Sequence, residues 1–168
     1  MSTATALESD VETTVFAEVE IDASPEDVFR ALTDPHELAE WWGGDKTYRT
    51  GAWEVDARPG GAWSARTTDA DGAEGIVHGE YLVVDAPRRL EYTWRPSWED
   101  FAPSRVRIDL APVRVGGEAG TRVTVTHTAP ARLTMRASAS PRTAEWTAVL
   151  TGLAGHLSLC GVGGGRGW

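Results

Sequence analysis

The chain of 168 residues is long enough for one domain with a hydrophobic core and short for two. Its 41% hydrophobic and 24% charged residues are typical of a globular protein and argue against a disordered chain. The formal net charge of -9, with Lys46 as the only lysine, argues against a nucleic-acid binder, because neutralising phosphates requires clustered cationic side chains.

Cysteine content and the N-terminal residues indicate the compartment. Cys160 is the only cysteine, so neither an internal disulfide nor a cysteine zinc site is expected. The N-terminal residues contain no apolar segment like that of a signal peptide, and no stretch reaches the length of a membrane span. We therefore expect a cytoplasmic protein without a membrane span.

The N-terminal part is predicted to be a disordered lead-in followed by a strand. Residues 1–12 are small, polar and acidic, whereas a single domain is expected over residues 13–160. Apolar side chains then recur at every second position, at Val15, Ala17, Val19 and Ile21. This period of two predicts a strand with one buried face.

Two short helices are predicted after this strand. Ser24 and Asp34 are typical helix N-caps, and each is followed by a proline, which the first turn of a helix accepts. The second helix is expected to end at Trp41 and Trp42, just before two glycines.

Six further strands are predicted between residues 52 and 127, separated by turn signals rich in Gly, Pro and Asp. The last three strands alternate clearly, which favours an antiparallel sheet with one covered face. Their inward-facing residues are expected to be Leu90, Tyr92 and Trp94, then Val106, Ile108 and Leu110, then Val123, Val125 and His127.

A long helix starting near residue 140 is predicted to cover the sheet. Apolar residues recur at helical spacing on one of its faces: Trp146, Val149, Leu150, Leu153, Leu157 and Cys160. Gly152 and Gly155 weaken a helix and therefore suggest close packing against the sheet. Residues 161–168 are expected to form a flexible Gly-rich tail. The order of elements predicts the α+β class.

Several short sequence segments resemble those of a known superfamily. They are SPEDVFRALTDPHELAEWW, GGAWS followed by DGAEG, GEYLVVDAPRRLEYTW, GTRVTVTHT, and a Trp that opens the last helix. From about residue 14 to 160 the chain resembles START-like (SRPBCC, Bet v-like) proteins, and among them the activator of Hsp-90 ATPase homologue-like group. The resemblance implies a helix-grip fold, in which a curved antiparallel sheet of about seven strands wraps around a long C-terminal helix and encloses an apolar cavity.

Aromatic residues are the main candidates for lining that cavity. Eight tryptophans are many for this length, and those on inward faces either line the cavity or fill the core. Trp94 and Trp146 are expected to face each other. Trp42, Trp98 and Phe101 are interpreted as the rim or lid of the cavity, or as ordinary packing. The complete set of candidates is Trp42, Trp53, Trp63, Tyr92, Trp94, Val106, Val125, His127, Trp146 and Leu150.

Polar candidates are few. His127 is either a polar anchor or proton-transfer group in the cavity, or a hydrogen-bonded structural residue. Glu80, Glu91 and Glu145 either turn inward as an acid or base, or lie on the solvated sheet face. The inward face of the strand that carries His78 is left open. The histidines have no ligand spacing, and DADGAEG is interpreted as a hairpin turn, so no metal and no cofactor are predicted.

The favoured function is binding of an apolar or aromatic small molecule in the cavity between sheet and C-terminal helix. The first alternative is a cyclase-like or hydrolase-like enzyme in which His127 or Glu80 moves protons. The second is a protein-interaction module, such as a chaperone cofactor, and a homodimer is also left open. A cavity above about 300 Å³ beside Trp94, Trp146 and His127 would favour binding or catalysis. A filled core with an exposed apolar patch would favour a protein partner.

Overall fold

Seven antiparallel strands form one bent sheet in the computed structural model, which describes residues 12–42, 48–69, 71–97, 103–130 and 146–157. The strands are β1 (Glu12–Ile21), β2 (Tyr48–Val55), β3 (Ala62–Asp69), β4 (Glu74–Asp85), β5 (Arg89–Pro96), β6 (Ser104–Val115) and β7 (Glu118–Pro130). Their order is β1-β7-β6-β5-β4-β3-β2, so β1 and β2 are the two edges. The prediction of about seven antiparallel strands is confirmed.

Two short helices, α2 (Pro25–Thr33) and α3 (Pro35–Trp41), connect the edge strands β1 and β2 as predicted. Ser24 and Asp34 cap them, each accepting a hydrogen bond from a backbone N–H of the first turn, at 3.2 and 2.8 Å. The chain leaves α3 at Trp42, whose own N–H still donates to the last turn of the helix.

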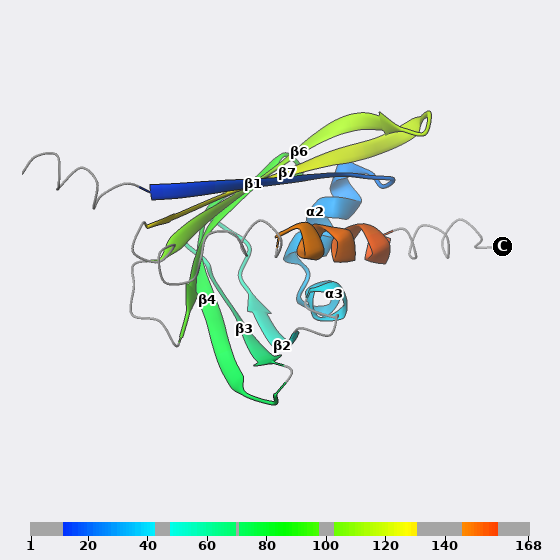
Figure 1. Ribbon diagram of the computed structural model, residues 1–168. Helices are drawn as coiled ribbons and strands as arrows, with labels where there is room; N and C mark the ends of the chain where they lie inside the picture. Colours follow the sequence, from blue (N-terminus) through cyan, green and yellow to red (C-terminus); the bar gives the residue numbers. More distant parts are fainter. Residues whose placement is uncertain (1–11, 43–47, 70, 98–102, 131–145, 158–168) are drawn as a thin grey trace, which may run out of the picture.

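A third helix, residues 146–157, lies in the angle of the bent sheet and is drawn in orange in Figure 1. Its buried face carries Trp146, Leu150, Leu153 and Leu157. Figure 1 also shows α2 and α3 on the same side of the sheet as this helix. All described helices therefore cover one sheet face, which confirms the helix-grip architecture of the α+β class.

The two glycines of this helix differ from the prediction. A Cβ at Gly152 would lie 3.2 Å from the carbonyl oxygen of Trp41, so the close approach is to the end of α3 and not to the sheet. A Cβ at Gly155 would meet nothing within 4 Å. Only Gly152 marks a tight contact, because only there does a neighbouring backbone come near the helix axis.

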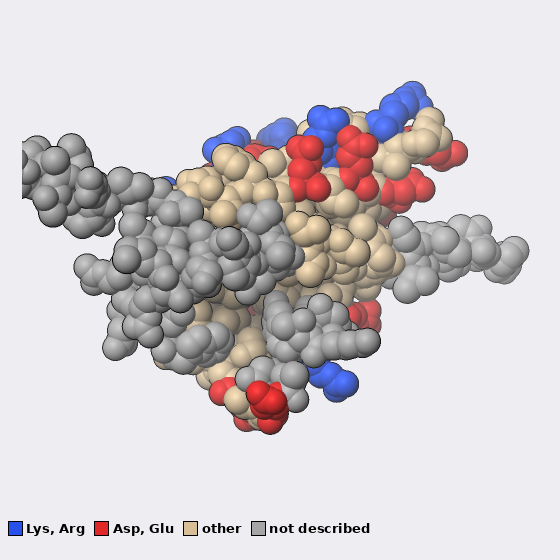
Figure 2. Space-filling model, in the orientation of Figure 1, with Lys and Arg blue, Asp and Glu red and all other residues tan. Residues whose placement is uncertain are grey.

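The two faces of the sheet differ in chemistry. The inward residues of β6 and β7 are buried, whereas the outer face carries ion pairs. Asp109 accepts from Arg89 at 2.9 Å and from Arg107 at 2.8 Å, and Glu20 accepts from Arg122 at 2.8 Å. The hydrogen bonds to Asp109 and Glu20 raise the pKa of Arg89 and Arg122. Figure 2 shows acidic and basic side chains intermixed over β1, β6 and β7 rather than gathered by sign.

The register of β4 decides the orientation of two polar candidates. β4 pairs with β3 without interruption and places His78 opposite Ser64 on the exposed face. The irregularity of this strand lies between Tyr81 and Val83, beyond His78, so the regular pairing with β3 settles the orientation of His78 that the sequence left open. Glu80 is exposed as well. Neither side chain points toward the concave side of the sheet.

Several predicted features fall outside the described residues. They are the lead-in predicted over residues 1–12, apart from Glu12, with which β1 begins, the loop aromatics Trp98 and Phe101, and Glu145, Cys160 and the tail over residues 161–168. Within the part of the chain that the structure describes, no helix is long and apolar enough to cross a membrane.

Candidate functional site

The concave side of the sheet holds a group of touching aromatic rings that we call the aromatic cluster. Its members come from the end of α3, from β2 to β5 and from the C-terminal helix. Neighbouring ring centroids lie between 5.2 and 6.0 Å apart, with orientations from stacked to edge-on. The cluster consists of Trp41, Trp42, Trp53, Trp63, Tyr81, Tyr92, Trp94 and Trp146.

Trp42 is the centre of the aromatic cluster. Of the two interpretations of Trp42, as a rim or lid residue or as ordinary packing, its burial favours packing, since it is only 5% exposed and touches four other tryptophans. Trp94 and Trp146, which were expected to face each other, each contact Trp42 instead, with centroids 6.0 and 5.8 Å away. The reason is local: the chain turns at the end of α3, and the Trp42 carbonyl accepts a hydrogen bond from Thr50 Oγ1 at 2.6 Å. This turn directs the ring inward.

The side chain of Trp63 on β3 reaches over the neighbouring strand β4. Its Nε1 donates to the carbonyl of Thr93 on β5 at 3.1 Å, although β4 runs between β3 and β5. Gly79 of β4 leaves room for this hydrogen bond, since a Cβ there would collide with the Thr93 carbonyl and lie 2.7 Å from the indole nitrogen of Trp63. The position of Trp63 therefore depends on a glycine in a neighbouring strand.

The space left between these rings is a small void of about 10 Å³, with room for about one water molecule. It is lined by Leu32, Leu38, Trp42, Trp53, Trp63, Tyr81, Leu90, Tyr92 and Ile108. These residues belong to α2, α3 and the sheet, so the void lies on the side of the short helices and not against the C-terminal helix. Trp94, Trp146 and His127 are not among the residues that line it.

The candidate cavity residues thus fall into two groups. Four of them border the void: Trp42, Trp53, Trp63 and Tyr92. The other six lie elsewhere in the core or at its margin: Trp94, Val106, Val125, His127, Trp146 and Leu150. Sequence periodicity placed the second group on the inward face, but this alone does not decide which inward residues border empty space.

His127 is a buried bridge between the sheet and the C-terminal helix. It is 3% exposed, and Trp146 Nε1 donates to its Nδ1 at 2.8 Å. An indole nitrogen only donates, so Nδ1 accepts and the neutral ring carries its proton on Nε2. That Nε2–H then donates to Ser104 Oγ at 2.7 Å, and the Ser104 hydroxyl donates to the Trp94 carbonyl at 3.3 Å.

This direction of hydrogen bonding bears on the enzyme alternative. A histidine that activates a serine accepts a hydrogen bond from its hydroxyl. Here the direction is reversed, because Ser104 Oγ accepts a hydrogen bond from His127 Nε2–H. Glu80, the other group considered for proton transfer, is exposed, and Glu91 is half-buried on a sheet position opposite Arg107. Sequence reasoning missed Ser104. Alternation along the strand could have placed it, because Ser104 lies two residues before Val106 and therefore faces inward as well.

Trp146→Phe is expected to lower the free energy of unfolding by about 2 kcal/mol, because it removes the hydrogen bond that Trp146 Nε1 donates to the buried Nδ1 of His127. Urea denaturation measures this change. The double variant Trp146→Phe/His127→Phe should cost less than the sum of the two single substitutions, since both buried polar partners are then absent. Strictly additive effects would contradict the hydrogen bond.

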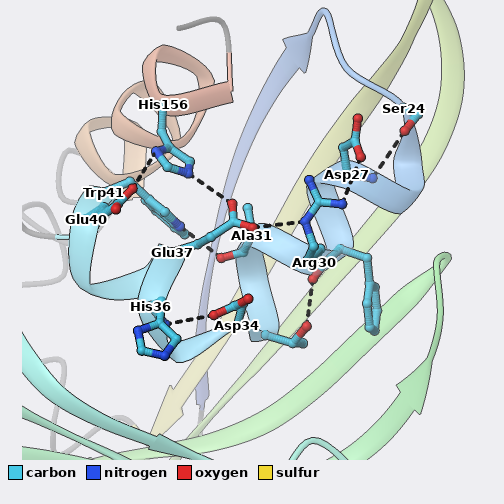
Figure 3. Close-up of polar contacts among 12 residues, drawn as sticks. Ser24, Asp27, Arg30, Ala31, Asp34, His36, Glu37, Glu40, Trp41 and His156 are labelled. Carbon is cyan, nitrogen blue, oxygen red and sulfur yellow. Dashed lines mark hydrogen bonds and ion pairs between the residues drawn. The ribbon is translucent and has the colours of Figure 1, made fainter. Parts of the chain in front are cut away.

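A polar network fastens the C-terminal helix to the two short helices (Figure 3). His156 Nε2 lies 3.0 Å from Glu37 Oε1, and Arg30 donates to the other oxygen of Glu37 at 2.9 Å. Trp41 Nε1 donates to the carbonyl of Ala31 at 2.9 Å. Because the residue four positions after Ala31 is a proline, which has no N–H, the indole supplies the donor that the helix lacks. These bonds fix the end of α3, from which Trp42 projects.

The electrostatics of the void are those of a neutral, apolar site. None of its lining residues carries a charge at neutral pH. Burial, and to a smaller extent the nearby charge of Asp56, raise the pKa of Tyr81. Its phenol therefore stays protonated at physiological pH, and the walls offer rings, aliphatic groups and neutral hydroxyls.

Comparisons with known proteins give matches at the level of family and fold. The family model described as Activator of Hsp90 ATPase homolog 1-like protein matches residues 22–158. No curated protein matches the chain. A crystal structure of the AHSA1 protein from Silicibacter pomeroyi is 27% identical, with a TM-score of 0.70 over 88% of this chain and 99% of that chain. A protein from Chromobacterium violaceum is 26% identical, with a TM-score of 0.70 over 84% and 94%.

An HSP90 activator from Plasmodium falciparum is more distant. It is 24% identical, with a TM-score of 0.52 over 69% of this chain and 72% of that chain, so this likeness shows the fold alone. The family match spans α2, α3, β2 to β7 and the C-terminal helix, which agrees with the resemblance seen in the sequence. The chain belongs to the family of Activator of Hsp90 ATPase homolog 1-like proteins.

Proposed function

We propose that this domain binds a flat, neutral, apolar or aromatic small molecule at the void within the aromatic cluster. One observation carries the proposal: the void is walled by aromatic and aliphatic side chains without a charged group, and it lies where α2 and α3 meet the sheet. Aromatic walls bind flat apolar molecules by desolvation and ring contacts, with few polar groups needed for orientation.

The present volume of the void sets a condition on this function. Small-molecule sites usually enclose about 300 to 1,000 Å³, whereas this void holds about one water molecule. A ligand therefore enters only when a side chain of the cluster moves aside. The cost of that movement reduces the apparent affinity, so we expect weak to moderate binding.

The experiment is titration of the purified chain with indole and with 2-naphthol. Isothermal titration calorimetry should show saturable binding, and the melting temperature should rise with ligand concentration. Naphthalene-2-sulfonate is the matched control, because it has the same rings with a charge that apolar walls do not solvate. The proposal fails if neither neutral compound binds or raises the melting temperature up to its solubility limit.

A second candidate function, as a cofactor of an Hsp90 chaperone, is favoured by the family match over residues 22–158. The small size of the void also agrees with a role for the surface. Among the described residues, however, the large exposed apolar side chains do not form one patch, since Phe16 lies on β1 while Ile76 and Leu82 lie on β4. Stimulation of the ATPase of a purified Hsp90 by this chain would support this candidate, and an unchanged rate at saturating chain would reject it.

A further inference from the structure

Trp53 differs from the other tryptophans of the aromatic cluster in its backbone. It lies on β2, an edge strand, next to an irregularity where the register with β3 shifts between Gly51 and Glu54. Ala52, the residue before it, has a φ of 49°, a left-handed conformation that residues with a Cβ seldom adopt. Such strain is retained where the surrounding structure requires it, and often at functional sites. Here it aims the side chain of Trp53 at the void.

The contacts that hold Trp53 are few and lie near the edge of the sheet. Its ring centroid is 5.8 Å from that of Trp63 and 5.6 Å from that of Trp42, and its Nε1 donates to Thr50 Oγ1 at 2.9 Å. The side chain is only half-buried. The side chains of Trp42 and Trp63 are both buried, and the Nε1 of Trp63 is bonded to β5, so Trp53 is the bicyclic side chain on the wall that is easiest to displace.

We propose that Trp53 is a displaceable plug, whose indole occupies the ligand site in the free domain and swings outward when a ligand enters. This inference rests on the proposed function and adds the identity of the moving residue. The ligand takes over the ring contacts with Trp42 and Trp63 that Trp53 gives up. Among the described residues β2 has no strand beyond it, so Trp53 can swing outward while the pairing of β2 with β3 is kept.

The plug also defines the chemical class of the ligand. The vacated space has the shape of an indole, so a planar neutral compound of two fused rings fits it. Thr50 Oγ1 donates to the Trp42 carbonyl at 2.6 Å and accepts from Trp53 Nε1. When the indole of Trp53 leaves, this partly buried acceptor loses its donor, and a ligand with one N–H or O–H replaces it. We therefore infer a bicyclic aromatic ligand with a single hydrogen-bond donor.

The test compares indole binding by the wild-type chain and by Trp53→Ala. Removing the plug abolishes the cost of opening, so indole should bind Trp53→Ala at least about tenfold more tightly than the wild type, since apparent affinity scales with the open fraction. Trp53→Ala should also bind indole about fivefold more tightly than 1-methylindole, which has no N–H to donate to Thr50. The double variant Trp53→Ala/Thr50→Val should lose this preference.

Two matched controls isolate the plug. Phe16→Ala removes an aromatic side chain from the other edge strand, where it is 64% exposed, and should leave indole affinity unchanged. In the wild-type background Thr50→Val removes one hydrogen bond from the closed form and, for indole, the equivalent bond from the bound form, so indole affinity should change little, whereas 1-methylindole should bind about threefold more tightly. Thr68→Val, on β3 opposite Arg49, should have no effect.

A spectroscopic readout covers the case in which Trp53→Ala fails to fold. In the wild-type chain labelled with 5-fluorotryptophan, the ¹⁹F resonance of Trp53 is assigned by its loss in Trp53→Phe. On saturation with indole it should move toward the shift of the unfolded chain, as expected for an indole that enters solvent. A resonance that stays in place while indole binds overturns the plug.

The outcomes separate this inference from the proposed function. Equal indole affinity of the wild type and a folded Trp53→Ala overturns the plug and leaves the proposed function standing. Absence of binding to both proteins overturns the plug and the proposed function together. If indole binds Trp53→Ala but not the wild type up to its solubility limit, the side chain of Trp53 never swings outward, and this result likewise overturns both.

Discussion

Trp42→Ala is expected to lower the free energy of unfolding by about 4 kcal/mol, the middle of the usual range for a buried tryptophan replaced by alanine. The ring is 5% exposed and touches Trp41, Trp53, Trp94 and Trp146. The substitution leaves a cavity between α3, the sheet and the C-terminal helix that these rigid rings cannot refill. The loss therefore includes both the transfer energy of the ring and the cost of the cavity.

Urea denaturation followed by far-UV circular dichroism measures the effect of Trp42→Ala. Phe16→Ala is the control, because it removes an aromatic ring that is 64% exposed, and its effect should stay within about 0.5 kcal/mol. If Trp42→Ala cost no more than Phe16→Ala, the placement of Trp42 at the centre of the aromatic cluster would be wrong.

Gly79→Ala is expected to cost about 3 kcal/mol, an unusually large effect for one added methyl group. The new Cβ would collide with the backbone carbonyl of Thr93 on the neighbouring strand, and backbone cannot rotate away as a side chain does. It would also lie 2.7 Å from Trp63 Nε1, so the hydrogen bond from Trp63 to Thr93 would be lost with it.

The matched control for Gly79→Ala is Gly51→Ala, a strand glycine on β2 where an added Cβ would meet nothing within 4 Å. It should be neutral or slightly stabilising, because alanine restricts the unfolded chain more than glycine does. Thermal denaturation of both variants gives the comparison. Equal melting temperatures for the two variants would contradict the packing of Trp63 over β4.

The helix starts and the inward faces of the strands follow from short-range patterns in the sequence. Ser24 and Asp34 begin the two short helices, since a cap is a contact between residues two or three positions apart. The inward faces of β6 and β7 follow from alternation, because every second side chain of a strand points to the same side. The same rule indicates that Ser104 and His127 face inward, although it does not say that they bond to each other.

The void and the aromatic cluster depend on distances that no local pattern contains. The sequence alone determined that inward faces are rich in tryptophan, and the segments that resemble the family implied a cavity beside the C-terminal helix. The tertiary structure decided that Trp42 lies at the centre, that Trp63 reaches over Gly79, and that the remaining void lies on the side of α2 and α3. The reason is that alternation fixes the side on which a ring lies, whereas the volume between rings from distant elements is fixed only when those elements pack together.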